Sequence, residues 1–598
     1  MELFGVTALL LIVCAVFILA TIVRTRRQET ARLPPGPTPL PILGNLLQFS
    51  GKEVFKTFIK FAEKYGSVYT VYMGMERIVV LCGYDTVKSA LIEHGEIFGA
   101  RGHMPLLDKL SSGGHGIAGS NGERWKQLRR FSLTTLRNFG MGKRSIEERI
   151  QEEAHFLTEE FRKTNGQPVE PFFYLSRAVS NVICSVVFGH RFEYDDQRFL
   201  QMLHYLNEIP KCAASVWGQW YNVYPKVMEK IPGPHHRFFQ AIERIEEFIR
   251  EKIKMHQETL DPNFTRDFID VFLLKMEQEK DTTSTEFHMD ALVHTTIDLF
   301  AAGTETVSTT LQYGLLILLK HPEVEERIHQ EINQVIGRNR SPCVEDRARM
   351  PYTDAVIHEI QRFIDLLPLG IPHKVTQDIE FNGYVIPKDT TIYPLLNSVL
   401  QDPKQYMRPH EFNPGHFLDD KGKFCRNDAF MPFSAGKRIC VGEGLARMEL
   451  FLFISTILQN FTLKSVVALE DIDLTPSLSG VIKLRCCGGC THSERMWGNA
   501  IPFPFQQHYS LFQSRFELKP GQIGSILMPL KTYGRLQEPP PNNLLHITSG
   551  MPPLNLCITL QSLYSIHPPL SNGFLLFSHA SVSPSPPPAT EFSQLTVI

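Results

Sequence analysis

A glycine-rich segment that ends in a single cysteine carries the residue types of a nucleophilic or metal-binding site. It spans residues 433–442 and reads F-S-A-G-K-R-I-C-V-G. An apolar helical pattern, Glu443 to Leu458, follows at once and places Cys440 at a helix N-terminus. Backbone N–H groups and the helix dipole lower the pKa of a thiol there. The sequence therefore predicts a thiolate that acts as a nucleophile or as a metal ligand.

The residues around Cys440 favour the role of ligand. Gly436 and Gly442 permit tight turns and the close approach of a flat cofactor. Phe433 is placed to shield the sulfur from water, and Arg438 to pair with an anionic cofactor edge. Together they favour a cofactor-bound metal over a free cysteine buried in a turn.

The full pattern, F-x-x-G-x-R-x-C-x-G, resembles the haem-binding loop of the cytochromes P-450, and every defining position is matched. The resemblance implies that Cys440 is the axial ligand of the iron in haem b (iron protoporphyrin IX). It also implies that Phe433, Arg438 and Gly442 lie against the haem.

Four further residues are candidates for binding the carboxylates of the haem. Trp125 and Arg129 lie at i and i+4 on one helix face. In the family this pair holds a haem propionate. Arg101, in the sequence Ala-Arg-Gly, and His373, in Ile-Pro-His, match two other propionate contacts of the family.

A long helical pattern, Asp290 to Leu319, contains the sequence A-A-G-T-E-T at 301–306. Small residues let a helix pass close to a cofactor. Thr306 is predicted to bond back to a carbonyl and open the helix locally, which sets a hydroxyl beside the Glu305 carboxylate. The set matches the oxygen-activation motif of the family, in which these two catalytic residues relay protons. Val307 departs from it, since close relatives often have Thr there.

Glu359 and Arg362 are i, i+3 neighbours on the helical pattern Tyr352 to Phe363 and form one ion-pair face. They match the E-x-x-R of the family, whose third partner corresponds to His416 here. We assign this triad a structural role.

Helical patterns dominate from Val87 to Gln334. Val68–Met73 and Ile78–Cys82 are predicted to form a hairpin. We expect it to pair with segments 376–381, 384–386 and 390–393 in one small mixed sheet. The predicted fold class is mainly α with a small β lobe (α+β), as in the cytochrome P-450 fold.

The N-terminal 23 residues are predicted to be a transmembrane signal anchor. Leu3 to Val23 is almost wholly apolar, and about 20 residues suffice to span a bilayer. Arg24, Arg26 and Arg27 follow it, which places the body of the chain in the cytosol. A cleaved signal peptide is the alternative. Residues 24–41 form a basic and proline-rich hinge, and the resemblance implies the endoplasmic reticulum membrane.

Composition excludes other classes of function. The formal net charge of −2 over 598 residues gives no general attraction to nucleic acid. The 11 cysteines show no disulfide-like spacing, which suits a reducing compartment. The aromatic segment 216–225 is suited to a membrane interface or to core packing.

Residues 42–484 are predicted to form the haem-thiolate domain. Their sequence resembles that of vertebrate microsomal family 2, nearest its C and H subfamilies. The closing strand of that family is missing after Leu484. Residues 485–598 are proline-rich in places and show no sustained period, so we predict a disordered tail.

The resemblance implies a monooxygenase that inserts one oxygen atom of O₂ into lipophilic substrates by hydroxylation or epoxidation. Fatty acids such as arachidonate, steroids and xenobiotics are the expected substrate classes. Electrons come from NADPH through a flavin-containing reductase, and cytochrome b5 is a second expected partner. A reductase-independent isomerase or peroxygenase and a non-catalytic isoform are the alternatives. The expected pocket residues are Ile117, Ala118, Asp298, Ala302, Leu367, Ile371 and Val481.

Overall fold

The computed structural model describes residues 32–49, 54–139 and 144–475, and the short strands 478–479, 483–484 and 514–518. The predicted anchor at 1–23, the pocket residue Val481 and most of the predicted tail lie outside the described residues. Within the described part, no helix is both long enough and apolar enough to cross a bilayer.

Helices make up most of the described chain, as predicted. Their bounds are α2 Val54–Tyr65, α3 Tyr84–Lys88, α4 Pro105–Leu110, α5 Gly122–Asn138, α6 Arg144–Lys163, α7 Pro171–Val187, α8 Gln197–Ala214, α9 Val216–Val223, α10 Pro225–Met228, α11 His236–Thr259, α12 Phe268–Gln278, α13 Met289–Lys320, α14 Pro322–Val335, α15 Pro351–Ile364, α16 Leu396–Leu400 and α17 Glu443–Asn460. Short turns of helix lie at η1 Leu46–Gln48, η2 Ser89–Glu93, η3 Val344–Arg349, η4 Pro414–Phe417, η5 Gly436–Arg438 and η6 Leu469–Asp471.

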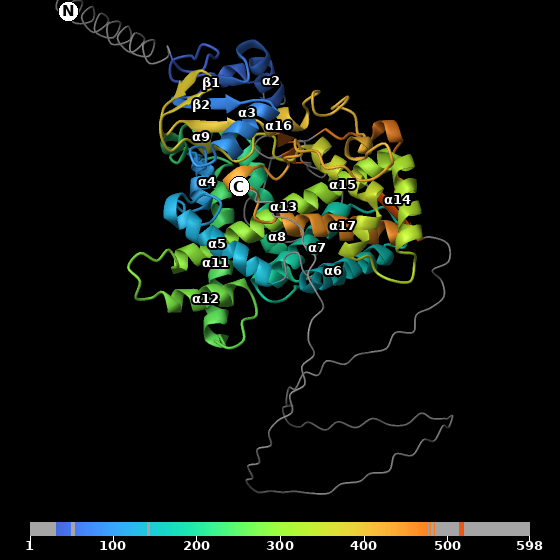
Figure 1. The fold of residues 1–598 in the computed structure, drawn as a ribbon. Coiled ribbons are helices and arrows are strands. Elements are labelled where there is room, and N and C mark those ends of the chain that lie inside the picture. Colours follow the sequence, from blue (N-terminus) through green and yellow to red (C-terminus); the bar gives the residue numbers. More distant parts are fainter. Residues whose placement is uncertain are drawn as a thin grey trace, which may run out of the picture. The chain divides into compact units, whose positions relative to one another are not determined.

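The long helix α13 is the centre of the helical part (Figure 1). It packs against α7, α8, α11, α14, α15 and α17. Its side chains are apolar or small on nearly every face, and a helix of that kind is stable only when neighbours surround it. Helices α13, α7 and α17 therefore supply much of the main hydrophobic core.

The strands are short. Their bounds are β1 Val68–Met73, β2 Glu76–Leu81, β3 Ala100–Arg101, β4 His373–Lys374, β5 Ile379–Phe381, β6 Tyr384–Ile386, β7 Thr391–Pro394, β8 Phe461–Ser465, β9 Leu478–Ser479, β10 Lys483–Leu484 and β11 Ser514–Leu518. The largest sheet has five strands in the order β1-β2-β7-β4-β3. It forms a lobe at one end of the described unit (Figure 1). The predicted β1–β2 hairpin is present, and β7 joins it in parallel.

The prediction of one mixed sheet is wrong in part. Strands β5 and β6 pair only with each other, as a separate hairpin. Asn382 and Gly383 join them with positive φ angles of 50° and 79°, a tight turn that returns the chain directly onto itself. The remaining two strands of the large sheet are β3 and β4, which are too short to leave a periodic sequence signal.

The proline-rich segment after residue 33 is docked along β1. The backbone N–H of Thr70 donates to Pro35 O at 2.8 Å, and its hydroxyl donates to Pro34 O at 2.8 Å. A Cβ on Gly36 would lie 1.8 Å from Thr70 O, so only glycine fits there. This part of the predicted hinge therefore has a fixed place on the sheet.

One strand within the predicted tail is among the described residues. β11 pairs antiparallel with β8, from Phe461 opposite Leu518 to Ser465 opposite Ser514. The sequence analysis missed it, although Arg515 to Leu518 alternate polar and apolar residues, because one run of this length is a weak signal within a segment that shows no sustained period. The remainder of 485–598 lies outside the described residues.

Candidate functional site

The loop before α17 fixes the position of Cys440. Gly436 has a φ of 69°, and a Cβ there would lie 1.8 Å from Leu91 O, so the turn requires glycine. The Cys440 N–H donates to Phe433 O at 3.0 Å and closes the loop. Gly442 then caps α17. Cys440 lies immediately before the helix, as the sequence predicts.

The pKa of the Cys440 thiol differs from the sequence prediction. The backbone N–H groups of Gly442 and Glu443 and the charge of Arg129 lower it, but burial outweighs them and raises the pKa overall. The side chain is nevertheless exposed, because space beside the sulfur is open although protein surrounds it on other sides. The helix N-terminus alone does not produce a thiolate in this structure; a bound cation at the sulfur would.

Arg101 and Arg438 meet on the loop that precedes α5. Arg438 donates from Nε to Gly99 O and from Nη2 to Ser120 O, both at 2.8 Å. Arg101 donates from Nε to Ala118 O at 3.1 Å. The acceptors are uncharged, so burial and like charges lower the pKa of both guanidinium groups.

Trp125 and Arg129 extend this cluster from α5. The Arg438 guanidinium lies 3.9 Å from the centre of the Trp125 ring, and that of Arg129 lies 5.9 Å from it. Arg129 also donates to Ile439 O, next to Cys440. The predicted i, i+4 face of α5 is therefore directed at the cysteine loop.

His373 is brought to Arg101 by the sheet. Strands β3 and β4 pair Arg101 directly with His373. The imidazole donates from Nδ1 to Phe98 O at 2.8 Å, so its Nε2 accepts from Arg101 Nη1 at 3.2 Å. Burial and the neighbouring guanidinium groups lower the pKa of His373 to about 3, which keeps the ring neutral. His373 thus orients Arg101.

This cluster fits an anion with several acceptor atoms. Among the residues that the structure describes, no carboxylate pairs with Arg101, Arg129 or Arg438. Arg438 Nη1 and Trp125 Nε1 are buried donors without partners. Buried donors and unpaired cations are costly, so the site calls for a ligand with negative charge. The carboxylates of a haem, beside an exposed cysteine, meet this requirement.

The middle of α13 is accessible where the rest of the helix is buried. Ala302 is exposed, and Ala301, Gly303 and Thr306 are half-buried. Small side chains leave room along this stretch. The Thr306 hydroxyl donates to Ala302 O at 2.8 Å, as predicted. The predicted local opening is wrong, however, because α13 is helical throughout.

Glu305 lies on a different face from the Thr306 hydroxyl. Its Oε1 accepts from the Thr309 hydroxyl at 3.5 Å, one helical turn further on. Burial raises the pKa of Glu305 to about 7. The hydroxyl that donates to this carboxyl is therefore that of Thr309, which the sequence analysis missed; its i+4 spacing was the available signal.

Three of the predicted pocket residues are joined by hydrogen bonds. The Ala118 N–H donates to Asp298 Oδ2 at 2.9 Å, and Arg101 links Ala118 O to Ile371 O. Burial raises the pKa of Asp298 to about 7. Ile117 is buried and Leu367 is half-buried. Asp298 thus ties the loop before α5 to α13.

Glu359 and Arg362 form a fully buried ion pair with two contacts of 2.7 Å. Arg362 also donates to Leu400 O and Pro409 O, at 2.8 Å each. His416 Nδ1 lies 3.1 Å from Glu359 Oε2. The three predicted members of the triad therefore meet, and they join α15 to the segment that leads to the cysteine loop.

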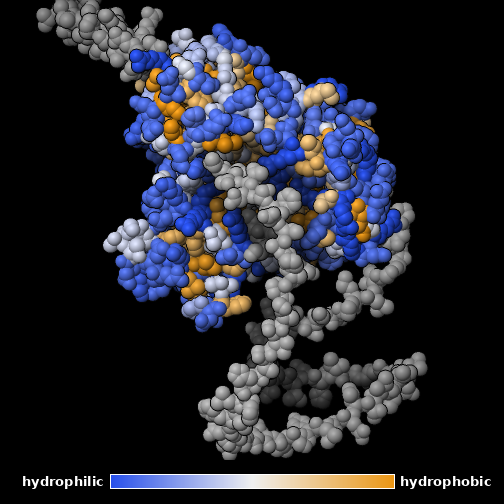
Figure 2. Space-filling model, viewed as in Figure 1, coloured by the Kyte–Doolittle hydropathy of each residue, from blue (hydrophilic) through white to orange (hydrophobic). Residues whose placement is uncertain are grey.

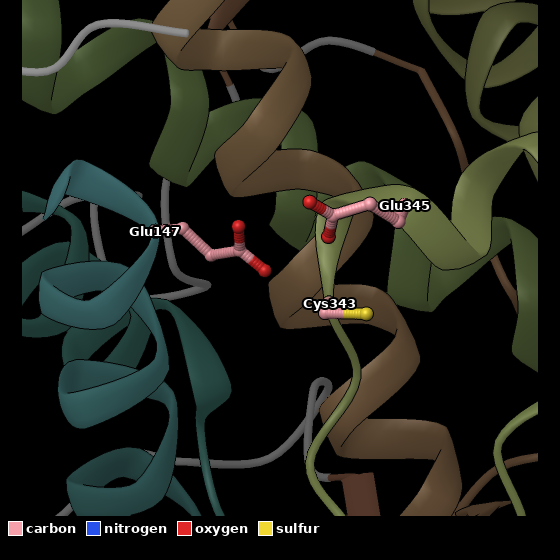
Figure 3. Close-up of side chains that lie close together, drawn as sticks. All are labelled: Glu147, Cys343 and Glu345. Carbon is pink, nitrogen blue, oxygen red and sulfur yellow. The ribbon is translucent and has the colours of Figure 1, made fainter. Parts of the chain in front are cut away.

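A second group of potential metal ligands lies apart from this site. Figure 3 shows Glu147 of α6 facing the segment that carries Cys343 and Glu345. Glu147 Oε1 already accepts from the Val344 N–H at 2.9 Å. The Cys343 thiol donates to Asp346 at 3.2 Å. These bonds join α6 to η3, so we assign this group a structural role.

Asn121 is a further residue that the sequence analysis did not single out for the site. Its Oδ1 accepts from the Arg101 N–H at 2.6 Å and from Arg438 Nη2 at 2.9 Å. It therefore holds the two arginines together. Its position just before α5 marks it as a capping residue, which conceals this role.

Comparison with known proteins agrees with this geometry. The family model described as Cytochrome P450 matches residues 34–484. The chain is 54% identical over 480 residues to cytochrome P450 2G1 of Oryctolagus cuniculus, covering 80% of this chain and 97% of that one. It is 56% identical to cytochrome P450 2C8 of Homo sapiens (79% and 96% covered). Identity to cytochrome P450 2H1 of Gallus gallus is 53% (81% and 98% covered).

Proposed function

This chain belongs to the cytochrome P450 family, whose members are haem-thiolate monooxygenases, and we propose that it inserts one oxygen atom of O₂ into lipophilic substrates. The observation that carries the proposal is the cluster of three arginines beside Cys440, which has no carboxylate partner among the described residues. The group that satisfies both the cations and the sulfur is haem b.

Cys440 would ligate the iron, and Arg101, Arg129, Trp125 and Arg438 would hold the haem carboxylates. When bound, the haem supplies the oxygen chemistry. His373 and Asn121 keep the arginines in place, so the cluster is organised before the haem binds. Phe433, half-buried in the loop, and Gly442 complete the wall around the sulfur.

Proton supply is the part of the reaction assigned to α13. Thr306 lies on the accessible stretch of the helix, and its hydroxyl is held by Ala302 O. Glu305, with a pKa raised to about 7, is able to take up and release protons near neutral pH. We assign Thr306 the orientation of water on the open face and Glu305 the storage of a proton behind it.

The pocket is proposed to be apolar. Its one acidic residue, Asp298, accepts a hydrogen bond from the backbone N–H of Ala118. The carboxyl group cannot turn toward a substrate without breaking that hydrogen bond. Ile117, Ala302, Leu367 and Ile371 offer only apolar side chains. This supports lipophilic substrates such as fatty acids, arachidonate among them, steroids or xenobiotics.

The membrane-facing surface is proposed to combine two segments distant in sequence. The Tyr224 hydroxyl donates to Ile42 O at 2.9 Å, which joins the end of α9 to the segment before β1. Exposed apolar side chains lie on the segment before β1, in the β1–β2 turn and on α9 and α10: Leu40, Ile42, Leu47, Met75, Val216, Trp217, Trp220 and Val227. Figure 2 shows hydrophobic patches over the β1–β2 lobe on a mostly hydrophilic face. An endoplasmic reticulum membrane, with the haem domain in the cytosol, is the proposed location.

NADPH-cytochrome reductase is the proposed electron donor, with cytochrome b5 as a second partner.

We expect Thr306→Ala to retain haem but to uncouple the reaction, because water on the open face of α13 loses its hydroxyl partner. Peroxide released and product formed per NADPH are measured with reductase present. An unchanged ratio would contradict the role of Thr306. Product formation without reductase would instead favour the peroxygenase alternative.

Removal of residues 1–30 is expected to weaken membrane attachment and to leave haem content unchanged, since no site residue precedes Arg101. In that shortened form, Trp220→Gln with Val227→Gln should reduce binding to phospholipid vesicles further. Met255→Gln, at an exposed apolar residue on α11, is the matched control. Loss of haem from the shortened chain would show that the N-terminal segment belongs to the fold.

A further inference from the structure

Three histidines meet where the loop before α5 packs against the first turns of α13. His115 belongs to the loop, His288 caps α13, and His294 lies on the helix one turn before Asp298. The centre of the His115 ring lies 5.2 Å from that of His288 and 6.1 Å from that of His294. Side chains that are distant in the sequence therefore form one imidazole cluster.

Two ring nitrogens of this cluster lack partners. Nδ1 of His115 and Nδ1 of His294 are both buried, and neither has a hydrogen-bond partner among the described residues. The His294 side chain belongs to a residue that is only 2% exposed. Because a buried polar atom without a partner is costly, a species that binds both nitrogens would stabilise this arrangement.

His294 has the surroundings of a metal ligand. Its Nε2 faces the Glu246 carboxylate of α11 at 3.8 Å, and the Leu110 backbone lies beside the ring. A proton on Nε2 leaves the lone pair on Nδ1, and a carboxylate behind the ring is the common second partner of a ligating histidine. Burial and, after it, the neighbouring His115 lower the pKa of His294 to about 4, so the ring is neutral at pH 7.

His288 has a different part in the cluster. Its Nδ1 accepts from the Ala291 N–H at 3.2 Å, so its lone pair is used to cap α13. The ring stands nearly perpendicular to that of His115, at an angle of 87°. His288 therefore packs against His115 and supports its orientation.

The charges near the cluster are compatible with a bound cation. Arg124 pairs with Glu286 at 2.6 Å, and Arg250 pairs with Asp290 at 3.0 Å. Both arginines thus have a carboxylate partner, and Glu246 offers a further carboxylate beside the imidazoles. Imidazole nitrogens suit zinc, copper and nickel ions, whereas calcium and magnesium ions take oxygen ligands.

Two other groups of ligand residues converge more closely but are already engaged. His256 Nε2 lies 2.7 Å from Asp267 Oδ2, and Arg266 holds the adjoining Asp270 through contacts of 2.7 and 2.8 Å. The group between α6 and η3 (Figure 3) is held by the hydrogen bonds described above. Of these three groups, the histidine cluster is the one with buried nitrogens still open to a ligand.

We propose that His115 and His294 form a binding site for a divalent ion of the zinc class, held through their two Nδ1 atoms and completed by water. Zinc binds imidazole nitrogen at about 2.0–2.1 Å, so two imidazoles on one ion have ring centres roughly 5–6 Å apart. The observed spacing of these two rings is close to that range.

An ion at this site ties the loop before α5 to α13. The two histidines precede Ala118 and Asp298, whose hydrogen bond joins the same loop and helix. The approach is already close, since a Cβ on Gly116 would lie 2.1 Å from Asp298 Oδ2. The ion therefore slows the opening of this pocket wall. This consequence rests on the proposed function, whereas the site itself does not.

The test uses zinc chloride with the full-length, haem-loaded chain, in which Cys440 is occupied by the iron. Zinc per chain, X-ray absorption at the zinc edge, thermal midpoint and backbone hydrogen exchange are measured. We expect an ion with two imidazole nitrogens and oxygen ligands. It should raise the thermal midpoint, because it binds the folded chain, and slow exchange in residues 113–118.

Four variants separate the roles within the cluster. His115→Phe keeps an aromatic ring and His294→Asn keeps a polar side chain, and each should lose this ion while it retains haem. His288→Ser keeps an oxygen to cap α13 and should retain the ion. Glu246→Gln should weaken binding by roughly 10–100-fold, as expected for loss of a carboxylate behind a ligand.

His204→Asn is the matched control, because it removes an exposed imidazole from α8 and should keep the ion. Cys343→Ser tests the group between α6 and η3 and should also keep it. Retention of the ion in His115→Phe or in His294→Asn, or its loss in Cys343→Ser, overturns the proposal. Zinc binding without slower exchange supports the site and overturns its effect on the loop. Since the ion is detected without turnover, failure of the proposed monooxygenase reaction would leave these outcomes unchanged.

Discussion

Replacing Cys440 by alanine is expected to abolish the thiolate-type absorption spectrum of the reduced, carbon-monoxide-bound protein and to reduce turnover to background. An alanine methyl group has no electron pair to give to iron, whereas the arginines that would hold the haem carboxylates remain. Haem binding is therefore expected to weaken rather than to disappear at high haem concentration.

Cys425→Ala is the matched control, because Cys425 is another exposed cysteine on a nearby loop and makes no contact with the arginine cluster. It should keep the spectrum and the turnover of the unaltered chain. Circular dichroism checks that both variants fold. A thiolate spectrum in Cys440→Ala would show that another cysteine ligates the iron, and the site would have to be reassigned.

Cutting the chain after Leu484 is expected to destabilise the haem domain, whereas cutting it after Ser525 is not. The shorter form loses β11 and leaves the whole length of β8 without its partner. Phe461 and Leu463 of β8 are buried in the main core, so the exposed edge lies beside that core. Backbone hydrogen bonds contribute about 1 kcal/mol each, so the loss is expected to be roughly 2–5 kcal/mol.

Thermal midpoint and haem per chain are measured for the full chain and for both shortened forms. The form ending at Ser525 matches the boundary of the compact unit and should equal the full chain. Phe516→Pro in the full chain provides a point test, since proline removes a backbone donor from the middle of β11. If the form ending at Leu484 were as stable as the full chain, β11 would contribute nothing to the fold.

The sequence by itself determined the features that depend on neighbours along the chain. The loop pattern placed Cys440 before α17, and the spacing of Glu359 and Arg362 placed their side chains on one turn. The periodic patterns predicted α2 with its observed bounds and α13 to within one residue at each end. Such features are predictable because helix periodicity, turns and i, i+4 contacts involve only a few successive residues.

The tertiary structure alone decided which distant groups meet. Arg101 faces His373 because two-residue strands pair there, and pairs of that length have no periodic signal. Asp298 accepts a hydrogen bond from the backbone N–H of Ala118, 180 residues away in the chain. The pKa of Cys440 rises because burial outweighs the helix N-terminus. β8 receives a strand from beyond residue 484. Burial and long-range pairing depend on the whole packed chain, so no local pattern could have determined them.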